Sequence, residues 1–176
     1  MQFHPTRLDG AWLIELTPAK DERGAFVRTF CEREFGDRGL ETRFVQHSLS
    51  VNAREGTLRG MHFQRAPHEE VKLVRCQRGS VWDVIIDLRP GSPTYMQWQG
   101  FELSAENRMQ LYVPKGFAHG FQTMSDDCEV FYLISEFYAA DAAAGLRHND
   151  ARFAIDWPLP VSVISDKDKD WSDFQP

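Results

Sequence analysis

The chain has 176 residues, of which 42% are hydrophobic and 26% charged, and this composition is typical of one globular domain with a substantial core. Its formal net charge of −6 argues against nucleic acid or an anionic membrane as a partner held by overall charge. An anionic ligand would therefore have to be bound by a local cluster of Arg and Lys side chains.

The three cysteines, Cys31, Cys76 and Cys128, form no closely spaced pair and leave an odd count, so we interpret them as reduced thiols of a cytoplasmic protein. The start of the chain carries no apolar signal segment, and no run reaches the roughly 20 apolar residues of a membrane span. Because no linker, repeat or low-complexity tract divides the chain, we expect residues 1–176 to form one domain.

Short apolar segments recur along the chain and are separated by Gly, Pro and Asp. In chain order they are residues 11–16, 43–51, 57–64, 71–76, 80–88, 97–103, 108–113, 120–123 and 129–137. The lengths of these segments and the turn residues between them predict the strands of an all-β sandwich or barrel. Helical patterning is weak, and it predicts single turns or short helices only at residues 31–35 and 141–145.

Alternation along two of these segments predicts burial on both faces. Within residues 81–88 the even-numbered positions are all apolar, and the odd-numbered positions mix apolar residues with aspartate. Residues 129–135 also carry apolar side chains on both faces. This pattern favours a barrel whose lumen and outer layer are both covered. Lys72, Asp83 and Tyr132 would then be polar groups set into apolar faces, which is how ligand cavities are lined.

His62 lies inside the segment 56–64, GTLRGMHFQ, where a buried imidazole needs partners. Taken alone, His62 fits two interpretations equally well: a hydrogen-bonded core histidine or a functional histidine. A cation nearby, such as Lys72, favours the neutral imidazole that accepts a proton. Strict alternation puts Arg59 on the opposite face, so it can join His62 only if Gly60 marks a bulge.

The other polar candidates also have structural interpretations. Lys72 alone is typical of an edge-strand lysine whose amine reaches solvent, and Tyr132 alone of a core residue with its hydroxyl on a backbone carbonyl. His119 follows Gly116 in a turn, so it could stabilise a loop or face a ligand. Tyr138 and the acidic residues near the C-terminus could simply lie on the surface.

Together, His62, Lys72 and Tyr132 could carry out proton transfer beside a carbonyl group. Removal of a proton from a carbon next to a ketone gives an enolate, which requires a neutral base and a fixed positive charge near the oxygen. Inversion of that carbon requires a second proton donor on the other face of the ring. The three side chains can fill these roles without a metal.

A metal site is the alternative. Many double-stranded β-helix proteins bind a metal through a His-X-His pair, a later Glu and a further His. Position 64 is Gln in this chain, so His62 and His119 alone remain of that set. Two histidines without a positioned carboxylate make a poor site for a transition metal, and we expect neither a metal nor a cofactor.

These residues and the motifs around them resemble the dTDP-4-dehydrorhamnose 3,5-epimerase family of cupin-fold sugar-nucleotide epimerases. The similar motifs cover nearly the whole chain, at residues 21–26, 56–64, 72–75, 83–89, 91–94, 102–107, 112–121 and 155–158. The resemblance implies a jelly roll, or double-stranded β-helix, with short peripheral helices. It also implies a homodimer that binds a nucleotide-linked sugar without a metal.

By the same resemblance, His62 would be the base at C3 and C5 of the sugar. Asp168 would orient it, since residues 165–168 are similar to the family's Ser-X-Lys-Asp ending. Lys72 would stabilise the enolate, and Tyr132 would return the proton from the other face.

The resemblance also implies a set of substrate-binding residues: Arg23, Phe26, Gln46, Arg59, Asp83, His119 and Tyr138. Arg23 and Phe26 match residues that contact the nucleotide, in the family from an exchanged N-terminal segment of the partner subunit. Asp83 is placed to hold His119.

Two positions depart from the family pattern. Arg28 stands where the family often has Glu, and Ser48 stands where it commonly has Asn. Both positions lie where nucleotide or sugar is bound, so the base and the hexose stay open.

The expected function is epimerisation at C3 and C5 of a nucleoside-diphospho-4-dehydro-6-deoxy-hexose, from dTDP-4-dehydro-6-deoxy-D-glucose to dTDP-4-dehydro-L-rhamnose. The close alternative is a single-position epimerase or a ketoisomerase on the same scaffold, and Tyr132 favours epimerisation over ketoisomerisation. A non-catalytic sugar-binding cupin would have no use for His62, Lys72 and Tyr132 together. Metal analysis would test the remaining class, a metal-dependent dioxygenase.

Overall fold

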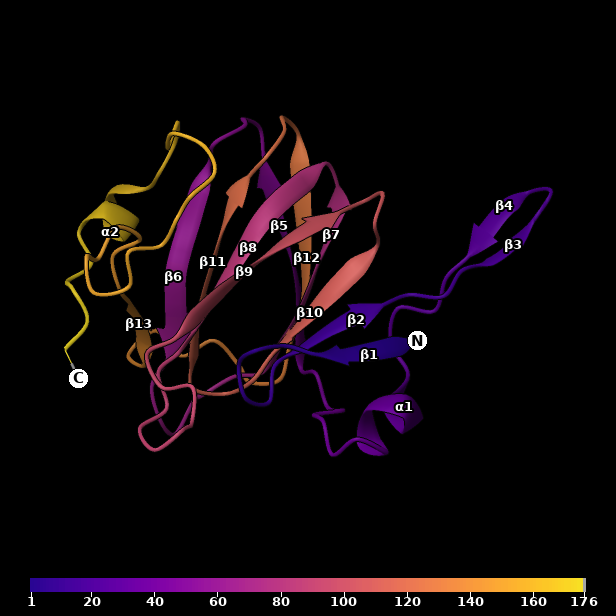
Figure 1. Cartoon of the computed structure of the whole chain (residues 1–176), viewed down its shortest axis with the longest axis horizontal. Helices are drawn as coiled ribbons and strands as arrows, with labels where there is room; N and C mark the ends of the chain where they lie inside the picture. Colours follow the sequence, from indigo (N-terminus) through magenta and orange to yellow (C-terminus); the bar gives the residue numbers. More distant parts are fainter. Residues whose placement is uncertain (176) are drawn as a thin grey trace.

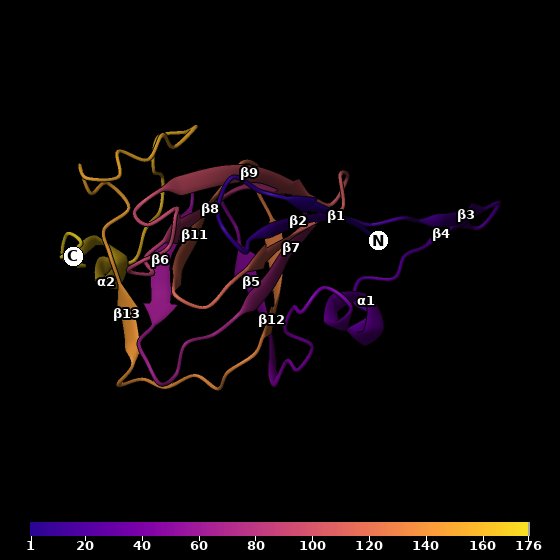
Figure 2. The same cartoon turned by 60° about the horizontal axis from the view of Figure 1, so that its bottom comes forward.

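The computed structural model describes residues 1–175, which form two antiparallel β-sheets that face each other (Figures 1 and 2). The six-stranded sheet has the order β1 (Gln2–Pro5), β2 (Trp12–Glu15), β10 (Met109–Val113), β7 (Lys72–Arg78), β12 (Cys128–Ile134) and β5 (Gln46–Asn52). The five-stranded sheet has the order β13 (Ala143–Gly145), β6 (Leu58–Gln64), β11 (Phe117–Thr123), β8 (Ser80–Asp87) and β9 (Trp98–Ser104). The predicted all-β fold is confirmed.

Four smaller elements lie outside these sheets. The strands β3 (Ala19–Asp21) and β4 (Gly24–Phe26) form a two-stranded hairpin that projects from the barrel (Figure 1). The helices are α1 (Glu32–Gly36), near the N-terminal strands, and α2 (Asp166–Lys169), which lies against β6. Within residues 1–175 neither helix is long and apolar enough to cross a membrane.

The space between the two sheets is filled by apolar side chains from both. Val81, Ile85 and Phe121 from the five-stranded sheet meet Val74 and Leu111 from the six-stranded sheet, and each of these is almost completely buried. Full burial of one such side chain contributes about 1.5–3 kcal/mol, so this core is a main source of stability.

The outer face of each sheet is covered as well. Segments near the N-terminus, with Phe35 of α1, pack over Leu73 and Leu133 on the six-stranded sheet. Segments near the C-terminus, with Phe153, pack over Val84 on the five-stranded sheet. The prediction that strands carry apolar residues on both faces because lumen and outer layer are both covered is therefore confirmed.

Several predicted boundaries differ from the structure. Of the single turn or short helix predicted at 141–145, a turn is present at 141–142, but residues 143–145 form β13 and pair with the edge of β6. Alanine favours helix, but three residues cannot gain enough from propensity to outweigh the pairing offered by an open strand edge. The strand predicted at 129–137 ends at Ile134, and the short helix predicted at 31–35 is confirmed as α1.

The predicted bulge at Gly60 is present. His62 pairs with His119 and Arg59 pairs with Phe121, so β6 has one more residue than β11 between the two pairs. A Cβ on Gly60 would lie 2.5 Å from the Cα of Gly120, so only glycine permits the two strands to approach so closely. The extra residue turns Arg59 to the same side as His62, and both line one cavity.

Candidate active site

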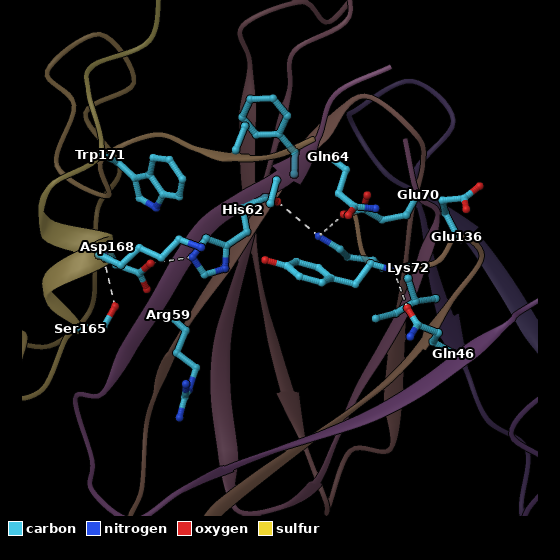
Figure 3. Close-up of a pocket in the computed structure, with 16 residues that line it drawn as sticks. Gln46, Arg59, His62, Gln64, Glu70, Lys72, Glu136, Ser165, Asp168 and Trp171 are labelled. Atoms are coloured by element: carbon cyan, nitrogen blue, oxygen red, sulfur yellow. Dashed lines mark hydrogen bonds and ion pairs between the residues drawn. The ribbon is translucent and has the colours of Figure 1, made fainter. Parts of the chain in front are cut away.

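A cavity of about 370 Å³ opens beside His62 at one end of the barrel (Figure 3). Its walls come from β6, from the start of β7, from the chain after β12, from β13 and from the segment around α2. Six of the predicted site residues line it: Gln46, Arg59, His62, Lys72, Tyr138 and Asp168. The fold thus brings together, in one cavity, residues that lie more than a hundred positions apart in the sequence.

His62 stands on the cavity wall with its imidazole bound to Asp168. The distance from His62 Nε2 to Asp168 Oδ1 is 2.7 Å, and the His62 side chain remains 44% exposed while that of Asp168 is almost fully covered. An ionised carboxylate only accepts hydrogen bonds, so this contact assigns the ring proton to Nε2. The lone pair of the neutral ring then lies on Nδ1, which can accept a proton.

Asp168 is held in place by the start of α2. The hydroxyl of Ser165 caps this helix and accepts a hydrogen bond from the backbone N–H of Asp168 at 3.1 Å. Burial alone would raise the pKa of the Asp168 carboxyl, but hydrogen bonds from His62 and from the Gly60 N–H outweigh it and lower that pKa below its usual value. Asp168 is therefore ionised at neutral pH.

Lys72 begins β7 in the interior of the six-stranded sheet, so its interpretation as an edge-strand lysine is wrong. Its Nζ lies 3.0 Å from Glu70 Oε1 and donates to the backbone carbonyl of His62 at 3.3 Å. The side chain is 11% exposed, and its amine forms part of the cavity floor (Figure 3). A fixed positive charge thus stands next to the candidate base.

Arg59 adds a second cation to the same wall. Its Nε donates to Asn52 Oδ1 at 2.7 Å, which fixes the guanidinium at the end of β5. The side chain remains exposed toward the cavity. Arg59 is thus available to an anionic ligand, because Asn52 and the Val51 carbonyl use two of its five N–H donors and leave three.

Tyr132, His119 and Asp83 lie behind the cavity, inside the barrel. The His119 Nε2 contacts Asp83 Oδ2 at 2.9 Å, so the predicted pairing of these two residues is present. The Tyr132 ring meets the His119 ring edge to face, with 5.9 Å between centroids. His119 in turn pairs with His62 across β11 and β6, so this group adjoins the candidate base.

The hydroxyl of Tyr132 keeps its proton at neutral pH. Burial raises the pKa of this phenol well above its usual value near 10, and the carboxylate of Asp83 raises it further, whereas the charge of Arg59 lowers it. A protonated phenol near the cavity can act as a proton donor.

Gln46 and Gln64 hold the chain that carries Tyr138. Gln46 Oε1 accepts a hydrogen bond from the Tyr138 N–H at 2.7 Å. Gln64 accepts from the Ala139 N–H at 2.7 Å and donates to the carbonyls of His68 and Phe137. Tyr138 itself is 65% exposed at the cavity edge.

Arg23 and Phe26 are not at this cavity. Both lie on the β3–β4 hairpin, which projects away from the barrel, and Phe26 is 78% exposed (Figure 1). Arg28 also lies outside the cavity, with its guanidinium 3.8 Å from Glu34. Ser48 lies on β5 opposite Tyr132.

Several residues of the cavity wall had no predicted role in the site. They include Glu70, Ser165, Lys167 and Trp171. The pattern Ser-X-X-Asp at 165–168 is a helix-start signal that could have revealed α2 and its capping serine. Glu70 follows Glu69 in an acidic pair and carries no signal that separates it from a surface residue.

Within residues 1–175 no three side chains of His, Cys, Asp or Glu are grouped closely enough to hold a metal ion. At position 64, where the metal-binding relatives of this fold carry the second histidine, all three backbone partners of Gln64 lie in neighbouring loops. The residue is thus committed to structure and cannot serve as a ligand.

Comparison with known proteins gives a consistent result. The family model for dTDP-4-dehydrorhamnose 3,5-epimerase matches residues 5–176. The dTDP-4-dehydrorhamnose 3,5-epimerase of Methanothermobacter thermautotrophicus is 47% identical over 173 residues, which cover 97% of this chain and 92% of the relative. A dTDP-4-dehydrorhamnose 3-epimerase from Streptomyces niveus is 38% identical, covering 97% of this chain and 82% of the relative.

The structural similarity is equally close. The crystal structure of dTDP-4-dehydrorhamnose 3,5-epimerase from Bacillus anthracis, with TDP and PPi bound, superposes with a TM-score of 0.95 at 40% identity. The superposition covers 98% of this chain and 99% of that one.

Proposed function

Because the chain belongs to the dTDP-4-dehydrorhamnose 3,5-epimerase family, we propose that it inverts C3 and C5 of a dTDP-linked 4-keto-6-deoxyhexose through an enolate. The chain is accordingly an isomerase that acts on a sugar nucleotide. The observation that carries the assignment of residues is the His62–Asp168 contact on the wall of a cavity whose floor carries the cation Lys72.

The mechanism begins with proton removal by His62. Its Nδ1 takes the proton from C3 or C5, each of which is adjacent to the C4 carbonyl. Asp168 stabilises the imidazolium that forms, because a carboxylate at 2.7 Å from Nε2 favours the charged ring. A positioned general base contributes a rate factor of about 100-fold to 10,000-fold.

Lys72 supports the charge that develops on the C4 oxygen. Its amine is largely covered and held by Glu70 and the His62 carbonyl, so little reorganisation is needed when the enolate forms. One oxygen serves both inversions, since C3 and C5 flank the same carbonyl.

Tyr132 returns a proton to the other face of the sugar. Its phenol stays protonated because burial raises its pKa. The position of Tyr132 beside His119, rather than on the wall that carries His62, supports a donor that approaches from a different side. Arg59, Gln46, His119 and Tyr138 bind the substrate in this proposal, and Asp83 holds His119 in place.

A homodimer completes the site in the same proposal. The hairpin residues Arg23 and Phe26 reach the nucleotide bound by the partner subunit, and the uncovered Phe26 supports this use. Leu49 and Val51 on the edge strand β5 are also exposed and would lie in a contact with a second copy. A cytoplasmic location is also part of the proposal, and the free thiols of Cys31, Cys76 and Cys128 support it.

The test is proton NMR in deuterated water with dTDP-4-keto-6-deoxyglucose as substrate. Deuterium uptake at C3 and at C5 is read separately, so a single-position epimerase, as the relative from Streptomyces niveus is named, would show uptake at C3 alone. His62→Ala should abolish uptake at both carbons. A rate within threefold of wild type would contradict the role of His62.

Tyr132→Phe separates proton removal from inversion. The change removes the phenol proton and almost no volume, so binding and packing should survive. Deuterium uptake should continue while formation of the inverted sugar falls steeply. If the two fall in parallel, Tyr132 is not the donor on the other face.

A further inference from the structure

Glu70 is a buried carboxylate of the cavity with one oxygen in use and the other free. Its side chain is 7% exposed, and Oε1 lies 3.0 Å from the amine of Lys72. The second oxygen, Oε2, is buried and has no hydrogen-bond partner within residues 1–175. Leaving a buried carboxylate oxygen unpaired is costly, so the position calls for a donor that arrives with the ligand.

The neighbourhood of Glu70 limits what that donor can be. A carboxylate only accepts hydrogen bonds, so the partner must carry an O–H or N–H group. The amine of Lys72 has three N–H bonds, and the Glu70 and His62 contacts use two of them. The third can reach the ligand, so a donor from Lys72 and an acceptor from Glu70 stand side by side at the cavity (Figure 3).

A 4-keto sugar offers the matching pair of groups. Its C4 oxygen accepts a hydrogen bond, and the hydroxyl on the adjacent C3 donates one. We propose that Glu70 is a specificity-determining residue whose Oε2 accepts the hydrogen bond of the C3 hydroxyl, while Oε1 fixes Lys72 at the C4 oxygen. The inference rests on the proposed function, because it takes the C4 oxygen to lie at Lys72.

The consequence is selection for sugars that keep the C3 hydroxyl. A site built to pair a substrate hydroxyl rejects the analogue that lacks it, because its own polar group is then left buried and unpaired. Among residues 1–175, neighbouring Glu136 does not share this property, because neither of its carboxylate oxygens is both buried and without a partner.

The experiment crosses two proteins with two substrates. Wild type and Glu70→Ala are each given dTDP-4-keto-6-deoxyglucose and its 3-deoxy analogue, and kcat/KM is measured for deuterium uptake at C5, which both sugars can undergo. In wild type, loss of the hydroxyl should lower kcat/KM by about 10-fold to 100-fold, the range of a hydrogen bond to a charged group. In Glu70→Ala the same loss should cost less than about threefold.

The crossed design separates the hydroxyl contact from the support of Lys72. If Glu70 acts only through Lys72, Glu70→Ala slows both substrates by one factor and leaves the ratio between them unchanged, which overturns the inference. A wild type that uses both sugars equally well also overturns it, because Oε2 would then bind water alone. A wild type without uptake on the parent sugar instead overturns the proposed function.

Two further variants complete the design. Glu70→Met keeps the volume and removes both oxygens, so it repeats the cross if circular dichroism shows that Glu70→Ala is unfolded. Glu129→Gln is the control, because Glu129 is a carboxylate on β12 that binds Gln77 at the surface. It should keep the wild-type ratio between the two sugars.

Discussion

Two peripheral segments of the chain behave in opposite ways. The α2 segment, residues 165–171, folds back on its own barrel, where Asp168 reaches His62 and the ring of Trp171 covers Gly145. The β3–β4 hairpin, residues 19–26, projects from the barrel and leaves Phe26 in solvent. The α2 segment closes the cavity of its own chain, whereas the hairpin leaves its aromatic ring exposed.

In the proposed homodimer, the two segments would serve different subunits. Asp168 buries its charge only because His62 and the Gly60 N–H of the same chain pair with it. The hairpin instead pairs Arg23 with its own Asp21 in full solvent and presents an uncovered aromatic ring. We infer that α2 supplies catalysis in its own subunit, whereas the hairpin supplies binding in the partner's site.

The largest effect is expected from Asp168→Asn. Loss of the carboxylate removes the partner that stabilises the His62 imidazolium, so kcat should fall by about 100-fold or more. NMR time courses of deuterium uptake would measure this fall in kcat. The KM should stay within about threefold, because the amide keeps the shape of the side chain. A change in KM alone would show that α2 serves binding.

A mixture of two damaged variants tests the comparison directly. Phe26→Ala damages the hairpin, and Asp168→Asn damages α2. If the hairpin serves the partner and α2 its own subunit, mixed dimers contain one intact site, and random mixing should restore about a quarter of wild-type activity. Activity of the refolded mixture, compared with each variant alone, measures this. Activity no higher than the mean of the two would show that one chain supplies both segments to its own site.

A smaller effect on kcat is expected from a substitution at the contact where Trp171 packs against Gly145. A Cβ on Gly145 would collide with the Trp171 ring, so Gly145→Ala should displace the wall that carries Asp168 and lower kcat by about tenfold. Gly36→Ala is the matched control, since its Cβ would lie 3.7 Å from Thr42, an ordinary contact. Equal activity of both variants would show that the position of Trp171 does not matter.

The smallest effect is a difference in acid stability. The pKa of Asp168 is lowered in the folded protein, so the stabilisation from its ionised form is present above the usual carboxyl pKa and is lost as the pH falls through the lowered value. Asp168→Asn should therefore flatten the acid side of a plot of Tm against pH. Asp21→Asn should leave it unchanged, because the pair with Arg23 is exposed. If both variants flattened the acid side of the plot equally, the buried Asp168 pair would contribute no more to acid stability than the exposed Asp21 pair.

Much of the fold follows from local pattern. Alternation within residues 80–88 and 129–137 identifies β8 and β12, and apolar residues on both faces predict the two covering layers. The pattern fails at 143–145, because pairing with β6 depends on where a distant strand edge lies. Sequence periodicity holds no such information.

The site was predictable to a different degree. The partner of His62 lies 106 positions away, and only a resemblance to a family could bring the two together. The bulge that turns Arg59 toward the cavity follows from the strand glycine Gly60. The free oxygen of Glu70 could not be predicted, since its burial depends on the packing around Lys72.

The hydrogen bonds of Gln64 bear on how this scaffold could change its chemistry. A single Gln64→His substitution would rebuild the His-X-His pair with His62, and a metal-dependent activity would seem one step away. That step would release two carbonyls and the Ala139 N–H at once, together with the chain that carries Tyr138. A variant with histidine at position 64 would therefore fold poorly unless both loops had first acquired substitutions that replace these hydrogen bonds.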